Sequence, residues 1–89
     1  MKAAKILVSG KVQGVFFRAS TKEMALEYNI RGWCRNTEDG KVEIFAQGSY
    51  NNVNEFFKWC NVGSRNARVD QVDVQFVETE KFESFEIRY

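Results

Sequence analysis

Two glycines and an arginine are spaced so that they can bind an anion in the segment SGKVQGVFFRAS, residues 9–20. Gly10 and Gly14 can adopt backbone angles closed to other residues and let a ligand approach the main chain. The segment joins a strand-like run to a helix-like run, so free N–H groups and the positive end of the helix dipole can face one ligand. Arg18 adds a guanidinium, which matches phosphate oxygens with two parallel donors. The pattern predicts a phosphate site.

The same segment also has a purely structural interpretation. Glycine is frequent in loops between a strand and a helix, and an arginine at a helix start is usually solvated. The segment lacks the lysine and the spacing of a nucleotide-binding P-loop. If a ligand binds here, a small phosphoryl group therefore fits better than a nucleotide.

Several kinds of chemistry are disfavoured by the residue types that the chain lacks. It contains no histidine and two cysteines, Cys34 and Cys60, without a CxxC pair. We therefore expect neither a zinc site nor a Cys–His nucleophile. The twelve acidic side chains are scattered at spacings that do not suit a metal ion. Because Cys60 lies on an apolar helical stripe and Cys34 in a strand-like run, we expect both to be buried, inert thiols. We also expect no cofactor.

The length and the net charge of the chain limit the kinds of partner that it can bind. A chain of 89 residues suits one domain, residues 1–89, near the lower size at which a single core folds unaided. Thirteen basic and twelve acidic residues give a net charge of +1, which provides no field for nucleic acid or an anionic membrane. No apolar run is long enough to span a bilayer, and Lys5 interrupts the one candidate signal segment. We expect a cytoplasmic monomer whose cysteines stay reduced.

The first half of the chain predicts a strand and then a helix. Residues 4–10 alternate, with Ile6 and Val8 opposite Lys5, as is typical of a central strand. The period becomes helical from about residue 17 to residue 29. One face of this helix carries Phe17, Thr21, Met24, Ala25 and Tyr28. A capping box of Ser20 and Glu23 predicts a start at Ser20, with a start two or three residues earlier as the alternative.

The second half predicts a hairpin, another helix and two strands. Asp39-Gly40 lies between two β-rich runs, and glycine supplies the positive φ that a hairpin turn needs. An apolar stripe at i, i+3, i+4 and i+7 then predicts a helix, with Ser49 or Asn52 as its cap and Gly63 as its stop. The stripe consists of Val53, Phe56, Phe57 and Cys60, and the last runs are RVDQVDVQFVE and FEIRY, in which Phe85, Ile87 and Tyr89 share a face.

This order of elements predicts an α+β fold. The order is β-α-β-β-α-β with a short final strand, the ferredoxin-like arrangement. Two helices that each carry one apolar stripe can both be covered if they pack on the same face of one mainly antiparallel sheet. The layout hosts many functions, so the fold alone assigns no activity.

Three segments resemble those of a known family. GKVQGVFFR, GWCRNTEDGKVEIFAQG and FEIRY are similar to segments of the acylphosphatases, which hydrolyse carboxyl-phosphate bonds. The resemblance runs from Lys5 to the C-terminus, and its first two segments are specific: V-Q-G-V-x-F-R, then G-W-x-x-N-x-x-D-G-x-V-E. It implies a hydrolase whose ligands are a small acyl phosphate and inorganic phosphate.

The resemblance also implies roles for particular residues. Arg18 binds the phosphate, and the Asn36 side chain holds the attacking water. The backbone amides around the same oxygens come from Gln13, Gly14, Val15, Phe16 and Phe17. Three positions depart from the family pattern: Phe16 and Asn29 stand where glycine is frequent, and Cys34 replaces a small aliphatic residue. We expect Phe16 to affect the mouth of the pocket, and Asn29 to act as a left-handed helix cap.

An acyl phosphate explains why no histidine is needed. Its leaving group is a carboxylate, whose conjugate acid has a pKa of about 4, so it departs without a proton. Catalysis is then mostly positioning and electrostatics. Two alternatives stay open: a non-catalytic module that binds phosphate or acyl phosphate, and an RNA-binding domain of the same topology, which needs exposed aromatic residues on its middle strands.

Overall fold

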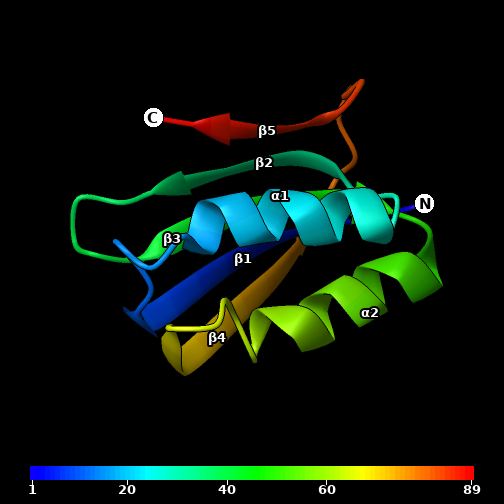
Figure 1. Ribbon diagram of the computed structural model, residues 1–89. Helices are drawn as coiled ribbons and strands as arrows, with labels where there is room; N and C mark the ends of the chain where they lie inside the picture. Colours follow the sequence, from blue (N-terminus) through cyan, green and yellow to red (C-terminus); the bar gives the residue numbers. More distant parts are fainter.

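The computed structural model describes all residues, 1–89, and the chain alternates strands with two helices. The elements are β1 (Lys2–Lys11), α1 (Phe17–Glu27), β2 (Arg31–Asn36), β3 (Val42–Gly48), α2 (Tyr50–Cys60), β4 (Arg68–Val77) and β5 (Phe85–Arg88). The five strands form one sheet in the order β4-β1-β3-β2-β5. All pairs are antiparallel except β2 with β5. Both helices cover the same face (Figure 1), which confirms the predicted ferredoxin-like α+β fold.

The main core lies between the helices and the sheet. Ile6 and Val8 of β1 are fully buried, and the exposed Lys5 faces the other way, as the alternation predicts. β1 is central because β3 and β4 flank it on both sides, with Ile6 opposite Ile44 and Val74. Burying such branched side chains from adjacent strands under two helices supplies the main stabilisation of the fold. No helix of the protein is long and apolar enough to cross a bilayer.

Helix α1 begins at Phe17, so the start predicted at Ser20 is wrong and the earlier alternative is correct. Phe16 is the N-terminal cap residue, and no side chain caps the helix. The N–H of Ser20 already donates within the first turn, to the carbonyl of Phe16 at 3.0 Å. Phe17 is 2% exposed, and its ring lies 5.6 Å from that of Trp59. Burial of this ring places the first helical turn, because it outweighs the modest preference of a capping box.

The end of α1, the cap of α2 and the apolar stripe of α2 agree with the sequence predictions. Asn29, directly after α1, has a φ of 53°, the left-handed conformation expected of it. Ser49 caps α2 by accepting a hydrogen bond from the N–H of Asn52. On the predicted stripe, Val53, Phe56 and Cys60 are buried and Phe57 is half-buried.

The hairpin between β2 and β3 forms where Asp39-Gly40 predicts it. Gly40 has a φ of 88°, and the N–H of Thr37 donates to the carbonyl of Lys41 at 2.9 Å. The loop therefore closes directly after Asn36, the last residue of β2. The end of β2, and therefore Asn36, lies at the same end of the sheet as the end of β1 and the beginning of α1 (Figure 1).

The second face of the sheet carries a small cluster that the sequence did not predict. Ala3, Trp33 and Phe45 are buried there, and Phe82 packs against them, with its ring 5.1 Å from that of Phe45. The side chain of Gln47 ties the connection between β4 and β5 to this face through both backbone groups of Glu80. The middle strands are therefore covered on both faces at this end.

The last strand is shorter than the FEIRY pattern predicts. Phe85 is buried and Ile87 is half-buried, but β5 ends at Arg88. Tyr89 lies beyond β5 with a fully exposed side chain. It therefore does not join the buried face of the strand.

Candidate active site

A cavity of about 370 Å³ opens at the beginning of α1. It brings together Arg18 and Asn36, which are eighteen positions apart in the sequence, with three of the predicted loop residues. Its lining consists of Val12, Gly14, Phe16, Phe17, Arg18, Ala19, Asn36, Ile87 and Tyr89. This lining is contributed or flanked by strands β1, β2 and β5 and by helix α1. The remaining two predicted residues, Gln13 and Val15, do not face the cavity with their side chains.

The two glycines of the loop have different functions in the structure. Gly14 has a φ of 74° with no atom within 4 Å of the position of a Cβ, and it lines the cavity, so a ligand can approach its main chain. Gly10 has a φ of 132°, but a Cβ there would lie 2.1 Å from the carbonyl oxygen of Arg68. Gly10 is therefore required by the bulged pairing of β1 with β4 and not by a ligand, which corrects its assignment to the site.

The backbone of the loop leaves its donors free. None of the N–H groups of residues 13–19 donates a hydrogen bond to another group of the protein. Those of Phe17, Arg18 and Ala19 belong to the first turn of α1, where N–H groups point along the helix axis out of its N-terminus. The cavity lies at this N-terminus, so these donors and the positive end of the helix dipole face it.

Phe16 makes the turn from the loop into α1 in a conformation that glycine prefers. Its φ and ψ are 58° and 27°, in the left-handed region. A non-glycine residue pays about 1 kcal/mol or more for this conformation. The structure thus supplies a physical reason for a glycine at this position, and it shows that Phe16 occupies the position with its ring 81% exposed.

Ser64 fixes the peptide group between Val15 and Phe16. Its buried hydroxyl donates to the carbonyl of Val15 at 2.8 Å. A trans peptide points its C=O and its N–H in opposite directions, and the chain has no cis peptide bond. The contact with Ser64 therefore turns the N–H of Phe16 away from the core. Ser64 lies in the connection between α2 and β4, and sequence reasoning missed it because nothing local links it to the loop.

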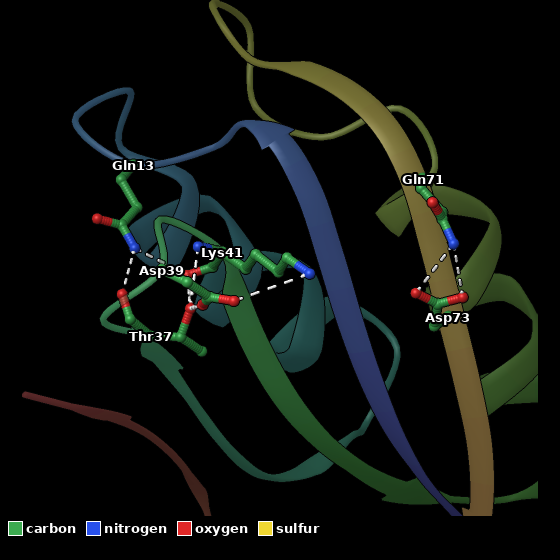
Figure 2. Close-up of polar contacts among 6 residues, drawn as sticks. All are labelled: Gln13, Thr37, Asp39, Lys41, Gln71 and Asp73. Atoms are coloured by element: carbon green, nitrogen blue, oxygen red, sulfur yellow. Dashed lines mark hydrogen bonds and ion pairs between the residues drawn. The ribbon is translucent and has the colours of Figure 1, made fainter.

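The side chain of Gln13 joins the loop to the hairpin that follows Asn36. Its Nε2 donates to the carbonyls of Thr37 and Lys41, each at 2.9 Å (Figure 2). The Thr37 hydroxyl in turn donates to the carboxylate of Asp39, and this contact lowers the pKa of the Asp39 carboxyl group. Besides its free backbone N–H, Gln13 thus contributes its side chain, which sets the position of the hairpin relative to the loop.

Arg18 is half-buried and is held by the C-terminal segment. Its Nη1 donates to the carbonyl of Arg88 at 3.4 Å, and its guanidinium carbon lies 4.8 Å from the centre of the Tyr89 ring. A guanidinium over an aromatic face is attracted by the ring quadrupole. No acidic side chain forms an ion pair with Arg18, so its charge is not neutralised within the protein.

Asn36 carries an unsatisfied acceptor. Its Oδ1 is the one buried side-chain oxygen or nitrogen in the protein without a hydrogen-bond partner. A buried polar atom without a partner costs free energy, so such an atom is found where a water or a ligand completes it. Because Asn36 lines the cavity, its side-chain amide can contact a group bound there.

The two cysteines are buried free thiols, as the sequence predicts. Burial raises the pKa of Cys34 to about 12 and raises that of Cys60 as well. The Cys34 sulfur lies under α1, 3.8 Å from the carbonyl of Arg18, so it packs against the site from below without facing it. No group of three or more His, Cys, Asp or Glu side chains is arranged to hold a metal ion.

These features define the class of protein: a ferredoxin-like α+β protein with a cavity of free backbone donors and one arginine at the N-terminus of its first helix. The family model for acylphosphatase matches residues 4–87, and the chain belongs to the acylphosphatase family. The resemblance of the three sequence segments is thereby confirmed.

Individual relatives agree with this assignment. The chain is 46% identical over 85 residues to an acylphosphatase of Haloquadratum walsbyi, covering 96% of this chain and 91% of that protein. The crystal structure of an acylphosphatase from Bacillus subtilis matches it with a TM-score of 0.97 and 34% identity over 100% of both chains. HypF from T. kodakarensis contains a similar unit, with a TM-score of 0.87 and 30% identity over 99% of this chain and 12% of that one.

Proposed function

We propose that this protein is an acylphosphatase, a single-domain enzyme that hydrolyses the carboxyl-phosphate bond of small acyl phosphates without a metal ion or cofactor. The observation that carries the proposal is the set of unpartnered N–H groups of residues 13–19 beside Arg18. The names of the relatives point to the same activity.

The phosphoryl group binds to the loop and to Arg18. Amide N–H groups at a helix N-terminus and a guanidinium are the donors that proteins use for phosphate oxygens. The backbone donors come from Gln13, Gly14, Val15, Phe16 and Phe17. Because Arg18 has no carboxylate partner, its charge is available to a dianion. The loop needs no rearrangement to free these donors, so the site is organised before the ligand arrives.

Asn36 orients the attacking water. Its side-chain amide lines the cavity and binds the water there, which turns a lone pair of the water oxygen towards the phosphorus. Positioning of this kind is a large part of catalysis when the nucleophile is already adequate. Asn36 comes from β2 and Arg18 from α1, so the two groups approach the phosphoryl group from different elements.

The reaction needs no general acid. The water oxygen forms a bond to phosphorus while the bond between phosphorus and the acyl oxygen breaks, and the electron pair leaves with the carboxylate. Both protons of the water end on the phosphate product, so the products are a carboxylate and dihydrogen phosphate. A carboxylate with a conjugate-acid pKa of about 4 leaves unprotonated. Arg18 and the amides stabilise the charge on the phosphoryl oxygens in the loose transition state.

Two other interpretations have less support. Trp33 and Phe45, the aromatic residues on the face of the sheet away from the helices, are 8% and 1% exposed, so they offer no stacking platform for RNA. A non-catalytic module that only binds phosphate would have no use for an unsatisfied Asn36 beside Arg18. We further propose that the protein has no nucleic-acid partner, because a net charge of +1 provides little attraction for a polyanion. We also propose that it is a cytoplasmic monomer.

The proposal is tested with benzoyl phosphate and p-nitrophenyl phosphate, assayed with EDTA and with competing inorganic phosphate. We expect hydrolysis of the acyl phosphate, inhibition by phosphate and negligible hydrolysis of the monoester, whose leaving group is poorer. Arg18→Ala abolishes turnover and phosphate inhibition, and Arg18→Lys recovers little because the forked donor pair is lost. Loss of activity in EDTA, or a lysine variant nearly as active as the wild type, contradicts the proposal.

A further inference from the structure

We infer that the rings of Phe16 and Tyr89 form an aromatic rim that binds the acyl group, so that the preferred substrates are acyl phosphates with an aromatic or bulky apolar acyl group. The inference rests on the proposed function, because it concerns the part of the same substrate that the phosphate site leaves uncovered. Both rings line the cavity that contains Arg18 and Asn36.

Phe16 presents a large apolar ring at the mouth for no structural reason. The ring is 81% exposed, and no other aromatic ring packs against it. The residue also keeps a left-handed backbone conformation that glycine would adopt without strain. A strained and exposed aromatic residue that stacks on no other ring of the protein is typical of a position that contacts a ligand.

Tyr89 places a second ring beside the phosphate-binding group. Its side chain is fully exposed, yet its ring lies against the Arg18 guanidinium, with 4.8 Å between the guanidinium carbon and the ring centre. The ring therefore lies next to the charge that attracts the phosphoryl group. The half-buried Ile87 continues this apolar wall into the cavity.

The geometry of an acyl phosphate requires its acyl group to pass this rim. One bridging oxygen separates the phosphorus from the acyl carbon, so the acyl group begins within a few bonds of the phosphoryl group at Arg18. The proposed phosphate donors come from the loop, the first turn of α1 and Arg18, and the rings that line the same cavity come from Phe16 at the N-terminus of α1 and from Tyr89 in the C-terminal segment. A cavity of about 370 Å³ has room for one small ligand of this kind.

The test compares ligands that share the phosphoryl end and differ in the apolar end. Binding is measured by calorimetry with phenylphosphonate and methylphosphonate, which cannot be hydrolysed at an acyl oxygen, and turnover is measured with benzoyl phosphate and acetyl phosphate. We expect the wild type to prefer the aromatic ligand in each pair by about tenfold, the size of a well-placed aromatic contact. Phe16→Gly removes the ring and suits the left-handed backbone, so it folds and loses most of this preference.

Two further variants make the comparison specific. Tyr89→Leu keeps an apolar side chain without an aromatic face and also lowers the ratio between the paired ligands. Phe76→Leu is the matched control, because Phe76 is a similarly exposed phenylalanine, 63% exposed, on β4 outside the cavity. In Phe76→Leu we expect the ratio between the paired ligands, in affinity and in turnover, to stay that of the wild type.

The outcomes separate the inference from the proposed function. Turnover of both acyl phosphates with equal kcat/KM, unchanged in Phe16→Gly, overturns the rim and leaves the acylphosphatase intact. Tighter binding of phenylphosphonate that is lost in Phe16→Gly, without turnover of either acyl phosphate, supports the rim and overturns the catalytic proposal. Failure to bind either phosphonate, together with no turnover of either acyl phosphate, overturns both.

Discussion

The hydroxyl of Ser64 donates a hydrogen bond to the carbonyl of Val15 at 2.8 Å, across 49 positions of the sequence. The contact is buried, and it joins the connection after α2 to the loop before α1. By holding this carbonyl towards the core, it turns the next N–H, that of Phe16, to the outside. A residue without any contact to the ligand thus controls the direction of one donor of the proposed phosphate site.

Removing the Ser64 hydroxyl should weaken phosphate binding more than it weakens the fold. In Ser64→Ala the peptide group is free to rotate, and we expect the inhibition constant of phosphate to rise about tenfold, as expected for one misplaced charge-assisted hydrogen bond. Ser64→Thr keeps the hydroxyl and restores binding. Steady-state inhibition by inorganic phosphate provides the measurement.

A second serine provides the control for this prediction. Ser49→Ala removes the cap of α2 and lowers the free energy of unfolding by about 1 kcal/mol. It leaves the phosphate inhibition constant unchanged, because Ser49 has no contact with the loop. If Ser64→Ala behaved like Ser49→Ala, with reduced stability and normal inhibition, Ser64 would be a structural residue only.

Substitution of Gln13 should lower kcat through the hairpin that carries Asn36. Gln13→Glu has the same shape but cannot donate to the carbonyls of Thr37 and Lys41, and its charge repels both oxygens. We expect at least a tenfold lower kcat, since small displacements of catalytic groups are costly. Stopped-flow or steady-state kinetics at a saturating acyl phosphate concentration measures the effect.

Gln71→Glu is the matched control for the Gln13 variant. Gln71 is exposed on β4 and contacts Asp73, away from the hairpin (Figure 2). The control therefore makes the same chemical change without touching the loop or the hairpin. Equal kcat values for Gln13→Glu and the wild type would show that the contact does not position Asn36.

Asn36→Ala should separate turnover from binding. The variant lacks the side-chain amide proposed to hold the water, so kcat falls by about 100-fold, the usual cost of removing one preorganised polar group. Inorganic phosphate still binds, because Arg18 and the loop amides are intact. Weaker phosphate inhibition with a normal kcat would instead assign Asn36 to the phosphate site.

The cysteines predict a loss of stability at high pH. Burial raises the pKa of Cys34 from its ordinary value of 9.0 to about 12 and raises that of Cys60 in the same direction. The unfolded chain therefore releases these protons at lower pH than the folded protein does. The contribution of these thiols to the free energy of unfolding is complete below pH 9 and declines above it. For each thiol the decline is about 1.4 kcal/mol per pH unit until the pKa of the folded state is reached.

A variant without thiols isolates this effect from the titration of lysine and tyrosine. Urea unfolding of the wild type and of the double variant Cys34→Ala/Cys60→Ala is compared from pH 7 to pH 11. The double variant is less stable at pH 7, because it loses buried volume, but its stability declines less steeply above pH 9. Parallel curves would show that the thiols titrate alike in the folded and unfolded states.

Much of the fold is encoded in patterns that neighbouring residues form by themselves. The apolar stripe of α2, the Asp39-Gly40 turn and the left-handed Asn29 are each determined within a few residues, and each prediction is confirmed. The start of α1 was harder to predict from the sequence, because a local cap at Ser20 competed with the burial of Phe17 against Trp59. Local preferences of this size are overridden when a large side chain can be buried.

The sequence by itself determined the order of elements, and its resemblance to a known family indicated Arg18 and Asn36, which meet in the cavity. The tertiary structure decided which glycine serves the site, since Gly14 faces the cavity and Gly10 packs on Arg68. It also decided that Ser64 orients the loop and that Tyr89 lies on Arg18. Periodicity and turn chemistry act over a few residues and can be read along the chain, whereas these contacts join segments that become neighbours only when the sheet and helices have packed.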